Sequence, residues 1–69
     1  MSEINWRPHV LDLYLGKMLV DSEGNDLTYH HSGHGGWDLE VKAKNLRVED
    51  VDGIQLCALL NLAGAREAK

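Results

Sequence analysis

The sequence contains a single cysteine, Cys57, a single proline and no phenylalanine. With one cysteine the chain forms no internal disulfide, and a zinc site built on several cysteines is excluded. No apolar run reaches the roughly 20 residues that a membrane-spanning helix needs. The opening residues, MSEINWRPHV, have neither the basic nor the apolar region of a signal peptide. We therefore expect a soluble protein of a reducing cytoplasm.

Cationic side chains are also scarce: seven Lys and Arg stand against eleven Asp and Glu, for a net charge of -4. Because clustered Lys and Arg bind phosphates, this balance argues against direct nucleic-acid binding and suits a basic protein partner. We expect one compact domain, residues 1–69. A chain this short buries only about 60% of its unfolded surface. A deep pocket would use up that core, so we expect a binding protein without enzymatic activity or cofactor.

Alternating side chains predict a small antiparallel sheet. In WDLEVKAK, residues 37–44, apolar and charged positions alternate, as in a strand with one buried face. Upstream, residues 17–20 and 26–30 flank the turn sequence DSEGN. Its Gly24 and Asn25 tolerate the positive φ of a tight turn. The expected fold class is α+β, a small antiparallel sheet of three or four strands packed by a C-terminal helix.

The C-terminal helix is expected to begin at Val48 and to end at Gly64 in a left-handed conformation. Glu49 and Asp50 then occupy its first turn, where the helix dipole favours negative charge. The Ile54–Leu62 segment is apolar almost all round, whereas a helix on a sheet needs a stripe of about 100°. Such a helix is buried on both sides, against the N-terminal segment or against a second copy in a homodimer.

The segment RPHVLDLYLGK leaves two alternatives open. Pro8 at a first helical position and Gly16 as a stop are typical of a short N-terminal helix. Leu11, Leu13 and Leu15 equally fit one face of a strand. The spacing of the proline and the glycine favours the helix.

Three of the four histidines lie in TYHHSGHGGWD, residues 28–38. On a strand, His30 and His31 point to opposite faces, whereas His31 and His34 could converge on a metal with a further ligand. The spacing matches no recognised zinc pattern, and three glycines indicate a loop between strands. We interpret the stretch as a loop with recognition contacts and without metal. A histidine metal site remains the alternative.

The carboxylates gather in three places along the sequence: at the hairpin turn, on the strand 37–44, and at the start of the expected helix. Strand residues two apart are separated by about 6.6 Å, so a folded acidic edge approaches the charge density of DNA. Ordinary solubilising charge is the competing interpretation. The predicted partner-binding residues are Asp21, Glu23, Asp26, Asp38, Glu40, Glu49, Asp50 and Asp52, bordered by His31, His34 and Trp37.

A very short, acidic α+β chain with the clusters DSEGND and RVEDVD resembles small phage-encoded inhibitors of bacterial defence, the anti-CRISPR proteins in particular. The resemblance is of overall character across the whole chain and carries over no residue role. It implies an inhibitor, cytoplasmic in a bacterial host, that mimics DNA and occupies a basic, DNA-reading surface of a CRISPR effector subunit. A dimeric structural or assembly protein that uses the Ile54–Leu62 helix is the second hypothesis, and a histidine metal-binding protein is the third.

Overall fold

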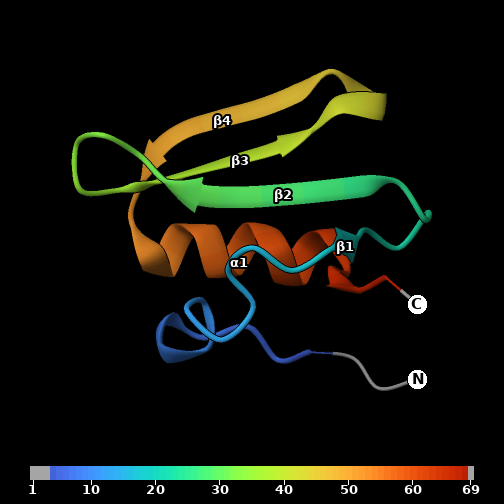
Figure 1. Ribbon diagram of the computed structural model, residues 1–69, viewed down its shortest axis with the longest axis horizontal. Coiled ribbons are helices and arrows are strands. Elements are labelled where there is room, and N and C mark those ends of the chain that lie inside the picture. Colours follow the sequence, from blue (N-terminus) through green and yellow to red (C-terminus); the bar gives the residue numbers. More distant parts are fainter. Residues whose placement is uncertain (1–3, 69) are drawn as a thin grey trace.

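A five-stranded antiparallel sheet packs against one α-helix in the computed structural model, which describes residues 4–68 (Figure 1). The strands lie in the order β4-β3-β2-β1-β5, and α1 runs along one face of the sheet (Figure 1). Two 3-10 turns complete the set. In chain order the elements are η1 (Pro8–Val10), β1 (Leu19–Val20), β2 (Asp26–His31), β3 (Trp37–Val41), η2 (Lys42–Lys44), β4 (Leu46–Val51), α1 (Gly53–Ala63) and β5 (Arg66–Glu67).

The expected α+β class is confirmed, and so is the hairpin formed by β1 and β2. The described residues hold five strands where three or four were expected. The additional strands are β4, whose residues from Val48 onward were assigned to the helix, and the two-residue β5. No helix in residues 4–68 is long and apolar enough to cross a membrane.

Alternation in the central strands gives the sheet one buried face and one solvent face. Leu27 and Tyr29 of β2 are buried, and so are Leu39 and Val41 of β3. They pack in one cluster with the buried side chains of α1, and each large apolar side chain contributes about 1.5–3 kcal/mol on burial. The intervening side chains of both strands point away from α1. They are exposed or half-buried, so this face is available to a partner.

The predicted start of the helix at Val48 is wrong. Val48 lies in β4, which pairs with β3 through Leu39 opposite Val48. The helix begins at Gly53, and the Asp52 carboxylate accepts a hydrogen bond of 2.7 Å from the backbone N–H of Gln55. Glu49 and Asp50 therefore belong to a strand and not to a first helical turn.

The predicted strand 37–44 also ends early, at Val41. The next three residues form η2, and Asn45 closes this turn with a left-handed φ of 56°. The N–H of Asn45 donates to the carbonyl of Lys42 over 3.0 Å. This turn reverses the chain and places β4 antiparallel beside β3. Pairing with β3 keeps β4 extended and prevents it from forming a helix.

The helix α1 is buried on one side. Leu56, Cys57 and Leu60 lie in the core, whereas Ile54 and Leu62 are 74% and 85% exposed. Burial on both sides, expected from the apolar composition, does not occur within the described chain. The predicted C-terminal stop is confirmed, because Gly64 has a φ of 69° in the left-handed region.

The N-terminal segment is neither the helix nor the strand considered for it. Pro8 occupies the first turn of the short η1, as its fixed φ favours, and irregular turns follow up to Gly16, whose φ is 82°. Leu11 is 1% exposed and enters the core. The Leu11 carbonyl also accepts a hydrogen bond from the Tyr29 hydroxyl, which joins this segment to β2.

Trp6 fastens the N-terminal segment to the end of α1. Its backbone N–H donates to Asn61 Oδ1 over 3.0 Å, and Asn61 Nδ2 donates to the Trp6 carbonyl over 3.2 Å. The Trp6 indole Nε1 donates to the Ala65 carbonyl over 3.0 Å. The ring is 2% exposed and meets Tyr29 edge to face, with centroids 5.8 Å apart. The apolar body and the polar N–H of this indole are therefore both satisfied.

Replacing Asp52 tests the position of the helix start. Asp52→Ala removes the acceptor for the Gln55 N–H, and loss of such a cap costs about 1 kcal/mol of stability. Asp52→Ser keeps an acceptor and should retain most of the wild-type free energy of unfolding. Urea denaturation followed by circular dichroism measures both variants. Equal stability of the alanine and serine variants would contradict the assignment of Asp52 as the cap.

Candidate acidic interface

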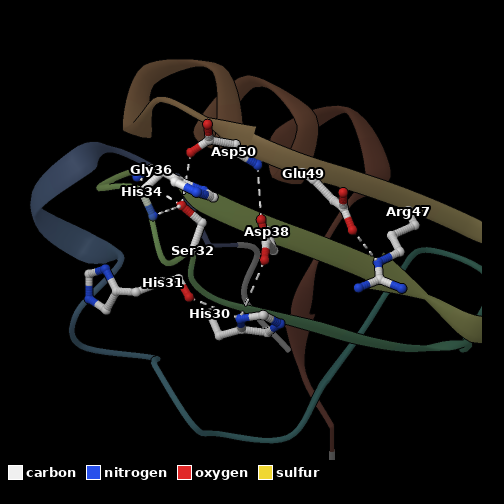
Figure 2. Close-up of polar contacts among 9 residues, drawn as sticks. All are labelled: His30, His31, Ser32, His34, Gly36, Asp38, Arg47, Glu49 and Asp50. Atoms are coloured by element: carbon white, nitrogen blue, oxygen red, sulfur yellow. Dashed lines mark hydrogen bonds and ion pairs between the residues drawn. The ribbon is translucent and has the colours of Figure 1, made fainter.

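The β2–β3 loop is held by the hydroxyl of Ser32 (Figure 2). Ser32 Oγ accepts from the N–H of His34 over 3.2 Å and from the N–H of Gly36 over 3.0 Å. It donates to Asp50 Oδ1 over 2.9 Å. The Ser32 N–H also donates to the Gly36 carbonyl over 2.9 Å. The hydroxyl thus uses its donor and both acceptor positions to order the loop and to tie it to β4.

A bulge in β4 shapes the neighbouring edge of the sheet. Trp37 is opposite Val51 and Leu39 is opposite Val48, so two residues of β4 oppose Asp38 alone. The second of them, Asp50, has a left-handed φ of 58°. Its N–H donates to Asp38 Oδ1 over 2.9 Å (Figure 2). The Asp38 carboxylate therefore satisfies a backbone group at the irregularity.

Gly36 is required where the loop passes this bulge. A Cβ on Gly36 would lie 2.8 Å from Asp50 Oδ1 and 2.9 Å from the Val51 carbonyl oxygen. Both distances are below van der Waals contact, so any other residue displaces the loop or β4. A Cβ on Gly33, in the same loop, meets no atom within 4 Å. The glycine-rich stretch therefore contains one glycine that a close approach demands.

The three histidines of this stretch do not converge. His30 Nδ1 lies 3.8 Å from Asp38 Oδ2. The ring of His31 stacks on Trp37 at a centroid distance of 4.0 Å, and its Nε2 is 4.0 Å from Asp12 Oδ1. Figure 2 shows the His31 ring turned away from the others. Within residues 4–68 no group of three or more His, Cys, Asp or Glu side chains is placed to hold a metal ion.

The placement of Asp21 contradicts its predicted role in partner contact. Asp21 is 2% exposed, and its Oδ1 accepts from the N–H groups of Glu23 and Asn25, each over 2.9 Å. Burial by itself raises the pKa of the Asp21 carboxyl, but these hydrogen bonds and the charge of Lys44 outweigh it and lower the pKa below 3.8. Asp21 therefore organises the β1–β2 turn and offers no charge to a partner.

Glu23 is exposed at the same turn but has a cationic neighbour. Lys44 Nζ lies 3.0 Å from Glu23 Oε1 and 3.6 Å from Asp21 Oδ2. The hydrogen bond to Glu23, together with both negative charges, raises the pKa of Lys44. Lys44 therefore offsets one of the negative charges at this turn, and the DSEGND cluster is less acidic than its sequence indicates.

Five of the six remaining predicted carboxylates lie on the solvent face of the sheet and at its bulge, whereas Asp52 caps α1. Register places Thr28 opposite Glu40 and His30 opposite Asp38, so the side chains of these pairs share a face. A hollow of about 360 Å³ lies at the bulged end, lined by Ser32, Gly33, His34, Asp38, Glu49 and Asp50. We call the carboxylates of this surface the acidic face: Asp26, Asp38, Glu40, Glu49 and Asp50.

Only part of the predicted border adjoins the acidic face. His34 lines the hollow at the bulge. Trp37 packs against Tyr29 with centroids 5.6 Å apart and is half-buried, and His31 stacks on it toward Asp12. Asp52 caps α1 and lies outside the acidic face. Of the three border residues, His34 alone is near the carboxylates.

Ser32 was missed as a positioning residue, and Lys44 as the partner of the turn carboxylates. A serine before a glycine-rich loop signals side-chain hydrogen bonds to the following backbone N–H groups, so Ser32 was accessible to sequence reasoning. The approach of Lys44 to Asp21 depends on how η2 folds back beside the β1–β2 turn, which no local pattern encodes.

Comparison with known proteins returned no matching family model, no matching curated protein and no matching solved structure.

Substitution of Gly36 tests the close approach at the bulge. Gly36→Ala forces a methyl group against Asp50 and Val51, and overpacking of this kind costs about 1–3 kcal/mol. Gly33→Ala adds the same methyl group in open space and should change stability by less than about 0.5 kcal/mol. Urea denaturation compares the two variants. If Gly33→Ala lowers the free energy of unfolding as much as Gly36→Ala does, the loss of stability comes from reduced loop flexibility and not from contact with β4.

The lowered pKa of Asp21 predicts a pH dependence of stability. A carboxyl whose folded pKa is depressed stabilises the protein fully above its ordinary pKa of 3.8, and this contribution is lost as the pH falls through the folded value. Asp21→Asn should therefore be less stable than wild type at neutral pH, with a difference that shrinks in acid. Asp26→Asn, which removes an exposed charge, is the control at neutral pH. A difference independent of pH would contradict the prediction.

Proposed function

We propose that this protein is a non-catalytic inhibitor whose acidic face covers a basic, nucleic-acid-binding surface of another protein. A DNA-reading surface of a CRISPR effector subunit is a target of this kind, as the anti-CRISPR-like character of the sequence suggests. The observation that supports the proposal is the position of the acidic face. It lies on the side of the sheet away from α1, where Asp26 and Glu49 are exposed and Asp38 and Glu40 are half-buried. Arg47, which lies opposite Glu40 and 2.9 Å from Glu49, offsets one of these charges.

The spacing of this surface suits a groove that accepts nucleic acid. Neighbouring strands lie about 4.8 Å apart and alternate residues of one strand about 6.6 Å apart. Duplex DNA presents its phosphates at about 3.4 Å along each strand, so several carboxylates fall within the span of a few phosphates. Opposite charge then steers the two surfaces together at low ionic strength.

Hydrogen bonds make one end of the acidic face rigid. Ser32 and Asp38 hold the bulge at Asp50 in place, so the hollow beside it exists before a partner arrives. A preformed surface loses little conformational freedom on binding, and this favours affinity from a small contact area.

The test distinguishes binding that depends on the acidic face from binding that depends only on the net charge of the protein. In the double variant Asp26→Lys and Glu40→Lys, two carboxylates of the acidic face that accept no hydrogen bond within residues 4–68 are reversed. The double variant Asp12→Lys and Glu67→Lys changes the net charge equally at positions outside it. Both are immobilised beside wild type, exposed to bacterial lysate and eluted with duplex DNA. Circular dichroism verifies their folding.

Wild type and the control variant are expected to retain the same DNA-displaceable protein. The acidic-face variant should bind that protein at least about tenfold more weakly, and wild-type binding should weaken with salt. Identical retention by both variants, or binding that salt and DNA leave unchanged, would contradict the proposal.

A further inference from the structure

The strand β4 has a free outer edge. In the described residues it pairs with β3 alone, and it is the outermost strand in Figure 1. Its six residues, Leu46–Val51, have the length of a typical strand. An unpaired strand edge presents backbone N–H and C=O groups to which another strand can add. The opposite edge, β5, has only two residues.

The charges on β4 are complementary to themselves. Arg47 and Glu49 are 65% and 60% exposed in their side chains, and Arg47 Nε lies 2.9 Å from Glu49 Oε2 (Figure 2). The two residues are separated by Val48, so they lie on the same face of the strand. If β4 pairs antiparallel with β4 of a second copy and Val48 is at the two-fold axis, each Arg47 is opposite the other copy's Glu49.

The alternative registers are less favourable. The two neighbouring registers that also keep both copies of α1 on one side of the sheet have the two-fold axis at Arg47 or at Glu49. They place Arg47 opposite Arg47 or Glu49 opposite Glu49. Like charges directly opposite each other destabilise a strand pair. The Val48-centred register alone among these three places opposite charges together, twice by symmetry.

The bulge and the apolar side chains agree with this register. The left-handed φ of Asp50 and the shift of register between β3 and β4 end the regular part of the strand after Glu49. Val48 is therefore near the middle of the usable edge. On the other face, Val48 meets its copy, and Leu46, which is 44% exposed, lies diagonal to it.

We infer that the protein forms a two-fold homodimer through antiparallel β4–β4 pairing, with Arg47 and Glu49 of each copy paired across the axis. The five strands of each copy then continue into one sheet. The axis is perpendicular to that sheet, so the two acidic faces adjoin on the same side. The internal Arg47–Glu49 pair is exposed and stabilises the monomer little, so the exchange of partners costs little. This inference does not rest on the proposed function.

Two single substitutions and their mixture test the pairing. Arg47→Glu leaves two glutamates opposite each other at both symmetric pairs of the homodimer, and Glu49→Arg leaves two arginines there. Each variant alone is expected to raise the dimer dissociation constant at least about tenfold, because both pairs become repulsive. Mixed together, the two variants place glutamate opposite arginine at both pairs. The mixture should therefore dimerise as wild type does, although neither chain retains the internal pair.

Analytical ultracentrifugation over a concentration series measures all species, with circular dichroism to verify folding. Lys42→Glu and Glu67→Arg are the charge-matched controls outside β4, and both should dimerise as wild type does. A wild type that stays monomeric up to millimolar concentration overturns the inference, and so does a mixture that remains monomeric. Dimers that survive the Arg47 and Glu49 substitutions but dissociate in the double variant Ile54→Gln and Leu62→Gln would show a helix-mediated contact instead.

Discussion

The left-handed backbone at Asp50 is the constraint on which the acidic end of the molecule depends. It turns the N–H of Asp50 to the Asp38 carboxylate and the side chain of Asp50 to the Ser32 hydroxyl. Only a glycine fits at position 36 beside it. The loop between β2 and β3, the end of β3 and the bulge of β4 are thereby one hydrogen-bonded unit. A stretch that looks flexible in sequence is a defined edge in the fold.

Half of the six aspartates of this chain accept hydrogen bonds from the backbone, and this changes the meaning of its acidic composition. Asp21, Asp38 and Asp52 each accept at least one backbone N–H. A short side chain with two acceptor oxygens suits turns, bulges and helix starts, and a small domain has many of these for its length. Among the described glutamates, Glu23, Glu49 and Glu67 are exposed and Glu40 is half-buried. The charge available to a partner is therefore smaller, and more localised on the sheet, than the composition indicates.

The features predicted correctly are those that one short segment encodes. Alternation fixed the buried face of β3, and Gly64 marked the end of the helix. The helix predicted from Val48 was wrong over residues 48–51. The carboxylates there fit a helix start, but pairing with β3 holds the segment in a strand. The prediction for Asp21 was wrong for a related reason. Its hydrogen bond with Asn25 is local to the turn, but the approach of Lys44 depends on how distant parts of the chain fold together. A count of charges along the sequence does not distinguish carboxylates that accept backbone hydrogen bonds from carboxylates that a partner can reach.

The contacts of Trp6 have a consequence for folding kinetics. Its hydrogen bonds reach partners 55 and 59 positions away along the chain. The core therefore joins residues from both ends of the described chain. Contacts of such separation form late, because their loop-closure entropy must be overcome before they contribute. During synthesis the hairpin can form early, but the indole finds its acceptor only after Ala65 has left the ribosome. This domain therefore stays incompletely folded on the ribosome until Ala65 has been released, despite its small size.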